Sequence, residues 1–184
     1  MKIEDNFLKQ EEFDKIQKLM MEPSNFPWFY SNAIDYKDYS NAIDYKDDVD
    51  KFQFLHMFYN KNAPNSEFLE DLSPINQVLN PVSLWRIKAN LLTRTPTIVE
   101  NKFHVDMHGI PEEKAKQWTT SIFYMNTNNG YTKFEDGTKV ESIANRMVTF
   151  PANMKHTGTS CTDEQTRVVI NFNYFGNTLK MRES

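Results

Sequence analysis

Apolar residues recur at helical spacing in two segments of the N-terminal part of this 184-residue chain. Residues 7–22 predict an amphipathic helix, because apolar side chains recur three or four positions apart among charged ones. Its apolar positions are Phe7, Leu8, Phe13, Ile16, Leu19 and Met20. Residues 66–79 suggest a second helix, which Pro74 could break. Between the two, residues 52–60 predict a strand rich in aromatic side chains.

From residue 83 onward, the chain is divided into short apolar or alternating runs, which are typical of β-strands. The runs are SLWRIKANLL, WTTSIFYMN, RMVTFPA and TRVVINFNYF. Asn-Gly at 129–130 and Asp-Gly at 136–137 predict hairpin-type turns between them. Many short strands after an initial helix favour a mainly β fold, a sandwich or jelly roll with helices packed outside.

The last of these runs separates two kinds of side chain on alternate positions. One face predicts core packing and consists of Val168, Ile170, Phe172 and Tyr174. The other face is largely polar and consists of Arg167, Val169, Asn171 and Asn173. A polar face that points into a barrel would line a ligand cavity. The run at 118–126 suits the same cavity through Thr120, Ile122, Tyr124 and Asn126.

Residues 30–47 contain a perfect tandem repeat, in which YSNAIDYKD at 30–38 recurs at 39–47. A nine-residue unit repeated once is too short for a solenoid. We therefore interpret the repeat as a small duplication in a surface loop. The alternative is a lid over a pocket, because long loops often carry function.

Composition narrows the setting and the partners. The net charge of −4 gives no broad electrostatic footprint for nucleic acid. Cys161 is the only cysteine, which fits a reducing intracellular compartment. The N-terminal stretch MKIEDNFLKQEEFDK is charged and has no apolar signal core, and no stretch has the apolar length to span a membrane. We therefore expect a cytoplasmic protein without nucleic-acid or membrane partners.

Candidate chemistry lies in the ordered set His104-Val105-Asp106, His156 and Arg167. In a strand, His104 and Asp106 would point to the same side and could chelate one ion together. Two imidazoles and one carboxylate form the facial triad of non-haem Fe(II) oxygenases, which leaves coordination positions open. Alone, His104 and Asp106 would more often be part of a surface turn or an ion pair. The ordered set with His156 and Arg167 favours the metal site.

Several other residues have a structural interpretation. His108 could join the site if the strand continued, but Gly109-Ile110-Pro111 predicts that the strand ends there. His56 is expected to be packed or hydrogen-bonded within an aromatic strand, and Cys161 to be unreactive. Tyr124 could contribute only to core packing.

Three segments resemble the catalytic core of 2-oxoglutarate/Fe(II)-dependent dioxygenases, and most closely the prolyl-4-hydroxylase-like branch. They are FHVDMH at 103–108, SIFYMNTNNGYTKFEDG at 121–137 and VESIANRMVTFPANMKHTGTSCTDEQTRVVINFNYF at 140–175. The opening IEDNFLKQEEFDKI resembles the N-terminal helix of that branch. KANLLTRTPTIVENKFHVDMH resembles small uncharacterised oxygenases of phage and marine-bacterial type.

The resemblance implies a double-stranded β-helix, a cupin-like jelly roll with iron in its open mouth. His104, Asp106 and His156 would be the catalytic iron ligands. Arg167 would pair with the distal carboxylate of 2-oxoglutarate, because its planar fork suits a carboxylate. Tyr124 would hydrogen-bond the same carboxylate, and Thr132 matches a cosubstrate-binding segment.

The chain also departs from the family's pattern. Asn90-Leu91 stands where the hydroxylases usually have Asn-Tyr, and Asn173 stands where an aromatic residue is common. Collagen-type members have Lys in place of Arg167. The substrate pocket is therefore expected to differ from that of any one prolyl hydroxylase.

We expect one domain over residues 1–184, with helices and strands at 1–80, including the duplicated loop, and a jelly-roll core at 83–175.

The resemblance implies an enzyme that uses Fe(II), 2-oxoglutarate and O2. It would hydroxylate a prolyl residue in a peptide or protein, or a small amino acid, and decarboxylate 2-oxoglutarate to succinate. One alternative is a nucleic-acid oxidative demethylase, which usually carries a second Arg in the motif R-x-N-x-x-x-R, and here the VVINFN directly after Arg167 contains no Arg. Another is a non-catalytic jelly-roll binding or structural module. The sequence leaves the oligomeric state open.

Overall fold

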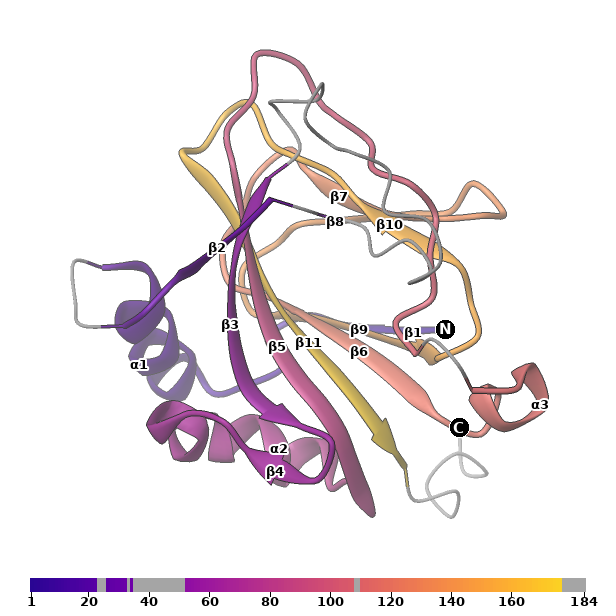
Figure 1. Ribbon diagram of the computed structural model, residues 1–184. Coiled ribbons are helices and arrows are strands. Elements are labelled where there is room, and N and C mark those ends of the chain that lie inside the picture. The colour runs from indigo at the N-terminus through magenta and orange to yellow at the C-terminus, as the bar shows by residue number, and fades with distance from the viewer. Residues whose placement is uncertain (23–25, 33, 35–51, 108–109, 177–184) are drawn as a thin grey trace.

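The computed structural model describes residues 1–22, 26–32, 34, 52–107 and 110–176. Most of the tandem repeat at 30–47 lies outside the described residues, and so does His108. The proposed lid and the role of His108 therefore stay predictions. The described chain is mainly β-structure, arranged as two antiparallel sheets that face each other (Figure 1).

The larger sheet has eight strands in the order β1-β9-β6-β11-β5-β3-β2, and β4 pairs with β3. Its strands are β1 (Lys2–Glu4), β2 (Phe29–Ser31), β3 (Gln53–Asn60), β4 (Ala63–Pro64), β5 (Ser83–Thr93), β6 (Thr119–Tyr124), β9 (Arg146–Pro151) and β11 (Thr166–Phe175). The smaller sheet has the order β10-β7-β8. Its strands are β7 (Tyr131–Phe134), β8 (Lys139–Glu141) and β10 (His156–Gly158). Two facing sheets with helices outside confirm the predicted mainly β jelly roll.

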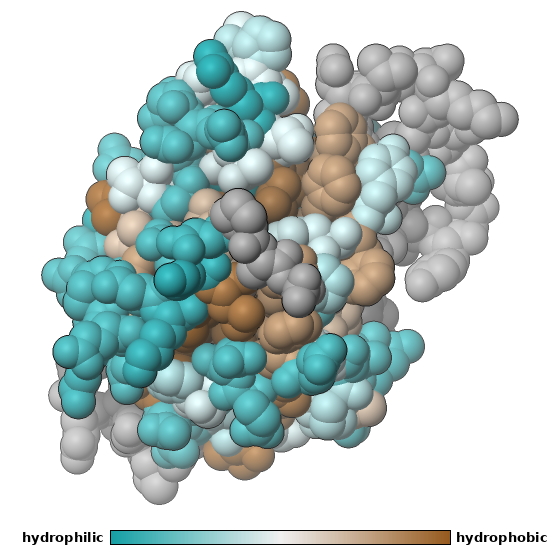
Figure 2. Space-filling model, turned by 90° about the vertical axis from the view of Figure 1, so that its left-hand side faces the viewer, coloured by the Kyte–Doolittle hydropathy of each residue, from teal (hydrophilic) through white to brown (hydrophobic). Residues whose placement is uncertain are grey.

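The described residues form four helices. They are α1 (Gln10–Met21), the 3₁₀ helix η2 (Glu67–Leu72), α2 (Ser73–Leu79) and the short α3 (Glu112–Ala115), which precedes β6. Helices α1 and α2 lie against its outer face (Figure 1). Seen from their side, the molecule is covered largely by hydrophilic side chains, with apolar ones visible between them (Figure 2). Within the described part of the chain, no helix is long and apolar enough to cross a membrane.

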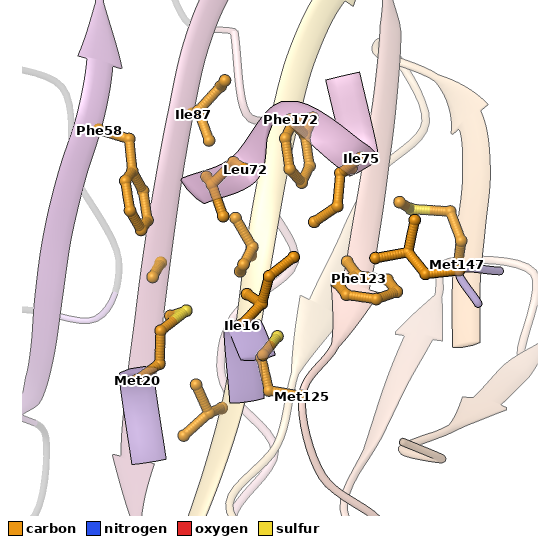
Figure 3. Packing of buried hydrophobic residues seen from close by; sticks show 14 of the residues in the cluster. Ile16, Met20, Phe58, Leu72, Ile75, Ile87, Phe123, Met125, Met147 and Phe172 are labelled. Carbon is orange, nitrogen blue, oxygen red and sulfur yellow. The ribbon is translucent and has the colours of Figure 1, made fainter. Parts of the chain in front are cut away.

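The main hydrophobic core fills the space between these helices and the larger sheet (Figure 3). Ile16 and Met20 from α1 and Ile75 from α2 pack there against Phe123 and Phe172 from the sheet. A second apolar cluster lies between the two sheets and consists of Ile122, Tyr124, Phe134, Val140, Val148, Phe150 and Val169. The helices therefore bury the outer face of the sheet, and its inner face carries both this second apolar cluster and polar groups.

The first helix begins later than the sequence pattern predicts, at Gln10 and not at residue 7. Asn145 accounts for the difference, because it binds the backbone just before the helix. Its main-chain oxygen accepts from the Phe7 N–H at 2.9 Å, and its side chain bonds both the N–H and the C=O of Leu8 at 2.9 Å. Leu8 is still buried in the core, so the apolar pattern is correct but the backbone there is not helical.

Two turn predictions had different outcomes. Asp136-Gly137 joins the paired strands β7 and β8, and Gly137 has a φ of 90°, as a hairpin glycine requires. Asn129-Gly130 does not form the predicted hairpin, because it links β6 of the larger sheet to β7 of the smaller one. Its backbone is held by side chains instead: the Gly130 N–H donates to Asn128 at 3.0 Å, and the Asn129 N–H donates to Asp163 at 3.0 Å.

Pro74 marks a change of helix type. Residues 67–72 form a 3₁₀ helix, and α2 starts at Ser73, so Pro74 lies in the first turn of α2. Proline is tolerated at this position because the first N–H groups of a helix have no partner within it. The predicted second helix is therefore two consecutive helices.

The inner face of the larger sheet carries side chains in register across β5, β11 and β6. The rows are Arg86–Asn173–Thr120, Lys88–Asn171–Ile122 and Asn90–Val169–Tyr124. The alternate positions of β11, from Val168 to Tyr174, belong to the outer core. The two predicted faces of the last strand are thus confirmed, and the polar face is directed toward the smaller sheet.

Candidate metal centre

Three potential metal ligands converge between the two sheets. His104 and Asp106 lie on the segment that joins β5 to α3, and His156 begins β10. Their ligand atoms all lie within 4.8 Å of one another. The sequence suggested that His104 lies in a strand. It lies outside the regular strands and forms an isolated β-bridge with His156. The two residues exchange N–H···O bonds of 3.0 Å, and this pairing sets the distance between their side chains.

Both imidazoles are held in the tautomer that leaves Nε2 available to a metal. The Nδ1 of His104 lies 3.1 Å from the Lys102 carbonyl, and the Nδ1 of His156 lies 3.1 Å from the Met154 carbonyl. A carbonyl oxygen can only accept, so each Nδ1 carries the proton and each Nε2 presents its lone pair. Burial lowers the pKa of His156, which favours the neutral form that binds metals.

Asp106 is held in place by two residues of the larger sheet. Its Oδ1 lies 3.0 Å from Nη2 of Arg86, and its Oδ2 accepts from Nδ2 of Asn173 at 3.1 Å. Asn173 also accepts from Nε of Arg86 at 3.0 Å, which closes a three-membered network. Burial alone would raise the pKa of Asp106, but the guanidinium of Arg86 and other nearby cationic groups outweigh it and hold this pKa below its usual range. Asp106 is therefore an oriented carboxylate anion.

No pattern in the sequence indicated the role of Arg86, and Asn173 was identified as a residue of the polar strand face and as a departure from the family's pattern, without a role in holding Asp106. The signal that could have found Arg86 is the alternation along β5, which places it on the same face as Lys88 and Asn90. Asn173 stands where related hydroxylases commonly have an aromatic residue. A phenylalanine ring at this position could not accept from Arg86 and donate to Asp106, as the Asn173 amide does.

Arg167 is a buried cation on the same inner face and is only 3% exposed. Its Nε donates to Ser142 at 2.7 Å, and its Nη2 donates to Thr132 at 3.2 Å. No carboxylate among the described residues forms an ion pair with it. A buried guanidinium whose only described hydrogen-bond partners are hydroxyls can still donate hydrogen bonds to a carboxylate that enters the cavity.

Tyr124 and Thr132 are coupled to Arg167. The Tyr124 hydroxyl donates to Oγ1 of Thr132 at 2.8 Å, and the Arg167 guanidinium lies 5.7 Å from the Tyr124 ring centre. Thr132 and Arg167 line the cavity, whereas Tyr124 is fully buried and contacts Thr132 from the second apolar cluster. The ring of Tyr124 therefore packs in the core and its hydroxyl binds Thr132, whereas a hydrogen bond from Tyr124 to a cosubstrate carboxylate stays a prediction.

Gly130 allows Arg167 to take this position. A Cβ at Gly130 would lie 2.6 Å from Cδ of Arg167 and 2.7 Å from the backbone oxygen of Ser160. It would also lie 2.8 Å from Oδ1 of Asn128. Backbone atoms cannot yield easily at such distances, so any larger residue at position 130 would displace the Arg167 side chain.

One cavity of about 70 Å³ connects the potential metal ligands with Arg167. Its lining includes the potential metal ligands His104, Asp106 and His156, and also Thr132, Arg167 and Lys88. A single water needs about 10–15 Å³ of such space, so the cavity suits a small organic molecule.

Two residues for which the sequence predicted a structural role lie outside this cavity. His56 is hydrogen-bonded to the Pro27 carbonyl and to Ser66, both at 2.7 Å, and Cys161 is fully buried.

Comparisons with known proteins place the fold. No protein-family model matches the chain, and no curated protein matches it. A prolyl hydroxylase of Trichoplax adhaerens, solved with a hypoxia inducible factor oxygen degradation domain peptide fragment, has a TM-score of 0.61 at 15% identity. That match covers 100% of this chain and 86% of the other.

Two further solved structures are similar over almost the whole chain. The α-ketoglutarate dependent non-heme epimerase SnoN from nogalamycin biosynthesis has a TM-score of 0.61 at 12% identity, over 95% of this chain and 76% of that one. A prolyl-4-hydroxylase of Pseudomonas putida has a TM-score of 0.54 at 11% identity, over 96% and 92%.

The chain therefore has the jelly-roll fold of 2-oxoglutarate/Fe(II) oxygenases. The resemblance to their prolyl-4-hydroxylase-like branch, expected from the sequence, is confirmed at the level of the fold.

Proposed function

We propose that this protein is an Fe(II)- and 2-oxoglutarate-dependent oxygenase, formed by a single domain over residues 1–184 that acts in the cytoplasm. It would convert substrate, O2 and 2-oxoglutarate to hydroxylated substrate, succinate and CO2. One observation carries the proposal. The same small cavity is lined by three potential metal ligands and by Arg167, which has no carboxylate partner among the described residues.

The donor set fits Fe(II). His104, His156 and Asp106 would supply two imidazole nitrogens and one carboxylate, a donor set that suits Fe(II) and leaves coordination positions for other ligands. Bound iron would supply the activation of O2, which no side chain can perform. The protein holds the histidine protons on Nδ1, keeps Asp106 ionised through Arg86, and surrounds the ion with buried side chains.

The second half of the cavity fits the cosubstrate. Arg167 offers guanidinium donors to the distal carboxylate of 2-oxoglutarate, and the Thr132 hydroxyl lies beside them. Tyr124 would act as a positioning residue through Thr132. Such charge-assisted hydrogen bonds are about twice as strong as neutral ones, so Arg167 is expected to dominate cosubstrate affinity.

The substrate is a prolyl residue in a peptide or protein, or a small amino acid. Support for the first comes from the similar Trichoplax enzyme, which was solved with a peptide. Support for the second comes from the polar lining of the cavity, which includes Lys88 and Asn171 besides Arg167. We rank a nucleic-acid demethylase lower, because the net charge is −4 and no second Arg follows Arg167 in VVINFN.

Anaerobic titration of the purified protein with Fe(II) and 2-oxoglutarate tests the proposal. Chelation of the 2-oxo acid by iron should produce a visible charge-transfer band. The band should be absent in His104→Gln and present in His56→Gln, a matched control whose imidazole lies outside the cavity. A folded wild-type protein without the band would contradict the proposal.

Asp106→Ala separates an enzyme from a binding module. In a non-catalytic jelly roll, folding and partner binding would survive this change. In an oxygenase, succinate production would be lost. Arg167→Met should weaken 2-oxoglutarate binding much more than metal binding, and equal loss of both would contradict the role of Arg167.

A further inference from the structure

Lys88 is a buried cation whose charge has no partner among the described residues. It lies on the inner face of β5 and is only 8% exposed. It lines the same cavity as His104, Asp106 and Arg167. Lysine is almost never buried to this degree unless it is paired. In the described part of the chain, its ammonium forms neither a hydrogen bond nor an ion pair.

Asp106 does not supply the missing partner. One of its oxygens is bound by Arg86 and the other by Asn173. A metal ion would take its remaining coordination capacity. Burial and, after it, the charge of Arg86 lower the pKa of Lys88 to about 8 against the opposing charge of Asp106, so the lysine is still mostly protonated at neutral pH. A charge of this kind is costly to the fold unless it has a ligand.

An unpartnered acceptor lies directly across the sheet. Asn171 is opposite Lys88 in the register of β5 and β11 and is also 8% exposed. Its Oδ1 is buried and accepts no hydrogen bond from the described residues. Directly opposed side chains of antiparallel strands have Cβ atoms about 5 Å apart. A cationic donor and a neutral acceptor therefore stand side by side in the wall of the cavity.

The cosubstrate does not account for both groups. Its distal carboxylate would pair with Arg167, and its other carboxylate would bind the metal. A third anionic group is then needed to neutralise Lys88, and an N–H donor is needed for Asn171. A free amino acid carries both, since its carboxylate and its ammonium are attached to one carbon atom.

We propose that Lys88 and Asn171 form the substrate-binding position, where Lys88 binds the carboxylate of a free amino acid and Asn171 accepts from its ammonium. The inference rests on the proposed oxygenase function and narrows its substrate to a small free acid. A prolyl residue inside a peptide has neither a free carboxylate nor a free ammonium, so this position would not select it.

The test compares Lys88→Met with Lys15→Met, a control at an exposed position on α1. In the first measurement, each anaerobic Fe(II) protein is titrated with 2-oxoglutarate through the charge-transfer band. Lys88→Met should change the dissociation constant less than threefold. A weakening of tenfold or more would show that Lys88 holds a cosubstrate carboxylate, and the substrate position would be wrong.

In the second measurement, calorimetry follows binding of the twenty free L-amino acids, and of their carboxamides, to the anaerobic Fe(II)–2-oxoglutarate complex. At least one free acid should bind ten times more tightly than its carboxamide. Lys88→Met should remove this difference, and Lys15→Met should keep it. Binding of no free acid, equal binding of acid and amide, or an undiminished difference in Lys88→Met would each overturn the proposal.

The two measurements also separate this inference from the proposed function. A wild-type protein that forms no charge-transfer band would contradict the oxygenase itself. A normal band without carboxylate selectivity would contradict only the role of Lys88 and Asn171.

Discussion

Replacing Lys88 with methionine should make the metal-free protein more stable. The change removes a buried ammonium that has no partner among the described residues and keeps an unbranched side chain of similar length. Most substitutions at buried positions destabilise a fold, so an increase would be unusual. It is expected where a residue serves ligand binding at the expense of stability.

The pKa of Lys88 gives the magnitude. Burial, followed by the charge of Arg86, lowers it from its ordinary value of 10.5 to about 8. Each pKa unit corresponds to 1.36 kcal/mol, so protonated Lys88 costs the folded state on the order of 3 kcal/mol. Lys88→Met should recover at most about this amount near pH 7, which for a domain of this size raises Tm by roughly 6–12 °C.

The sign of the pH dependence follows from the same values. Below pH 8, Lys88 is protonated in both the folded and the unfolded chain, so the full penalty is present. Between about pH 8 and pH 10.5 the unfolded state binds more protons, and the wild-type protein gains stability as the pH rises. The advantage of Lys88→Met should shrink over this window. The other titratable groups that line the cavity are His104, Asp106, His156 and Arg167, and the charge of Arg86 also acts on Lys88; all of them are the same in both proteins.

Urea unfolding in the presence of a chelator, at pH 7 and again above pH 9, measures the effect. The control Lys15→Met should stay within about 0.5 kcal/mol of the wild type at both values. A Lys88→Met variant that is less stable than the wild type at pH 7 would refute the reasoning, because Lys88 would then contribute a stabilising contact.

Three further predictions concern the site and the core. Gly130→Ala should displace Arg167 and weaken 2-oxoglutarate binding at least tenfold in the charge-transfer titration, with a stability cost of about 1–3 kcal/mol. Asn173→Leu should reduce metal affinity roughly 10- to 100-fold by calorimetry, because Asp106 loses a partner that orients it; unchanged affinity would count against that role. Phe172→Ala should cost about 3–5 kcal/mol in urea unfolding, because its ring is fully buried against the helices, and should leave the tautomers of the metal ligands unchanged.

The sequence predicted what depends on local alternation. The two faces of β11 could be read directly, because one was apolar and the other polar at every second position except Val169. The strand β3 and the Asp-Gly hairpin were predictable for the same reason, since pattern and turn chemistry agree there.

The remaining features depend on contacts between distant segments. The start of α1 is set by Asn145, which no property of residues 7–9 reveals. The Asn129-Gly130 pair has the composition of a hairpin turn, but it connects β6 of the larger sheet to β7 of the smaller sheet. The N–H of Asn129 binds Asp163, which is distant in the sequence. The pairing of Arg86 with Asp106 requires the register of β5 on β11, which cannot be read from one sequence.

The segment before the metal ligands runs along β10 without forming a regular strand. Its hydrogen bonds join Thr95 to Cys161, Ser160 to Val99, and His104 to His156. We call this set of backbone hydrogen bonds the seam. An ion bound by both His104 and His156 would stabilise the last of these pairs, so iron binding would favour the state in which the hydrogen bonds of the seam are formed. Without iron, the seam should open more often and expose the backbone near Lys102 to proteases. A cell short of iron would then degrade the empty protein first, and the amount of protein would follow the supply of its metal.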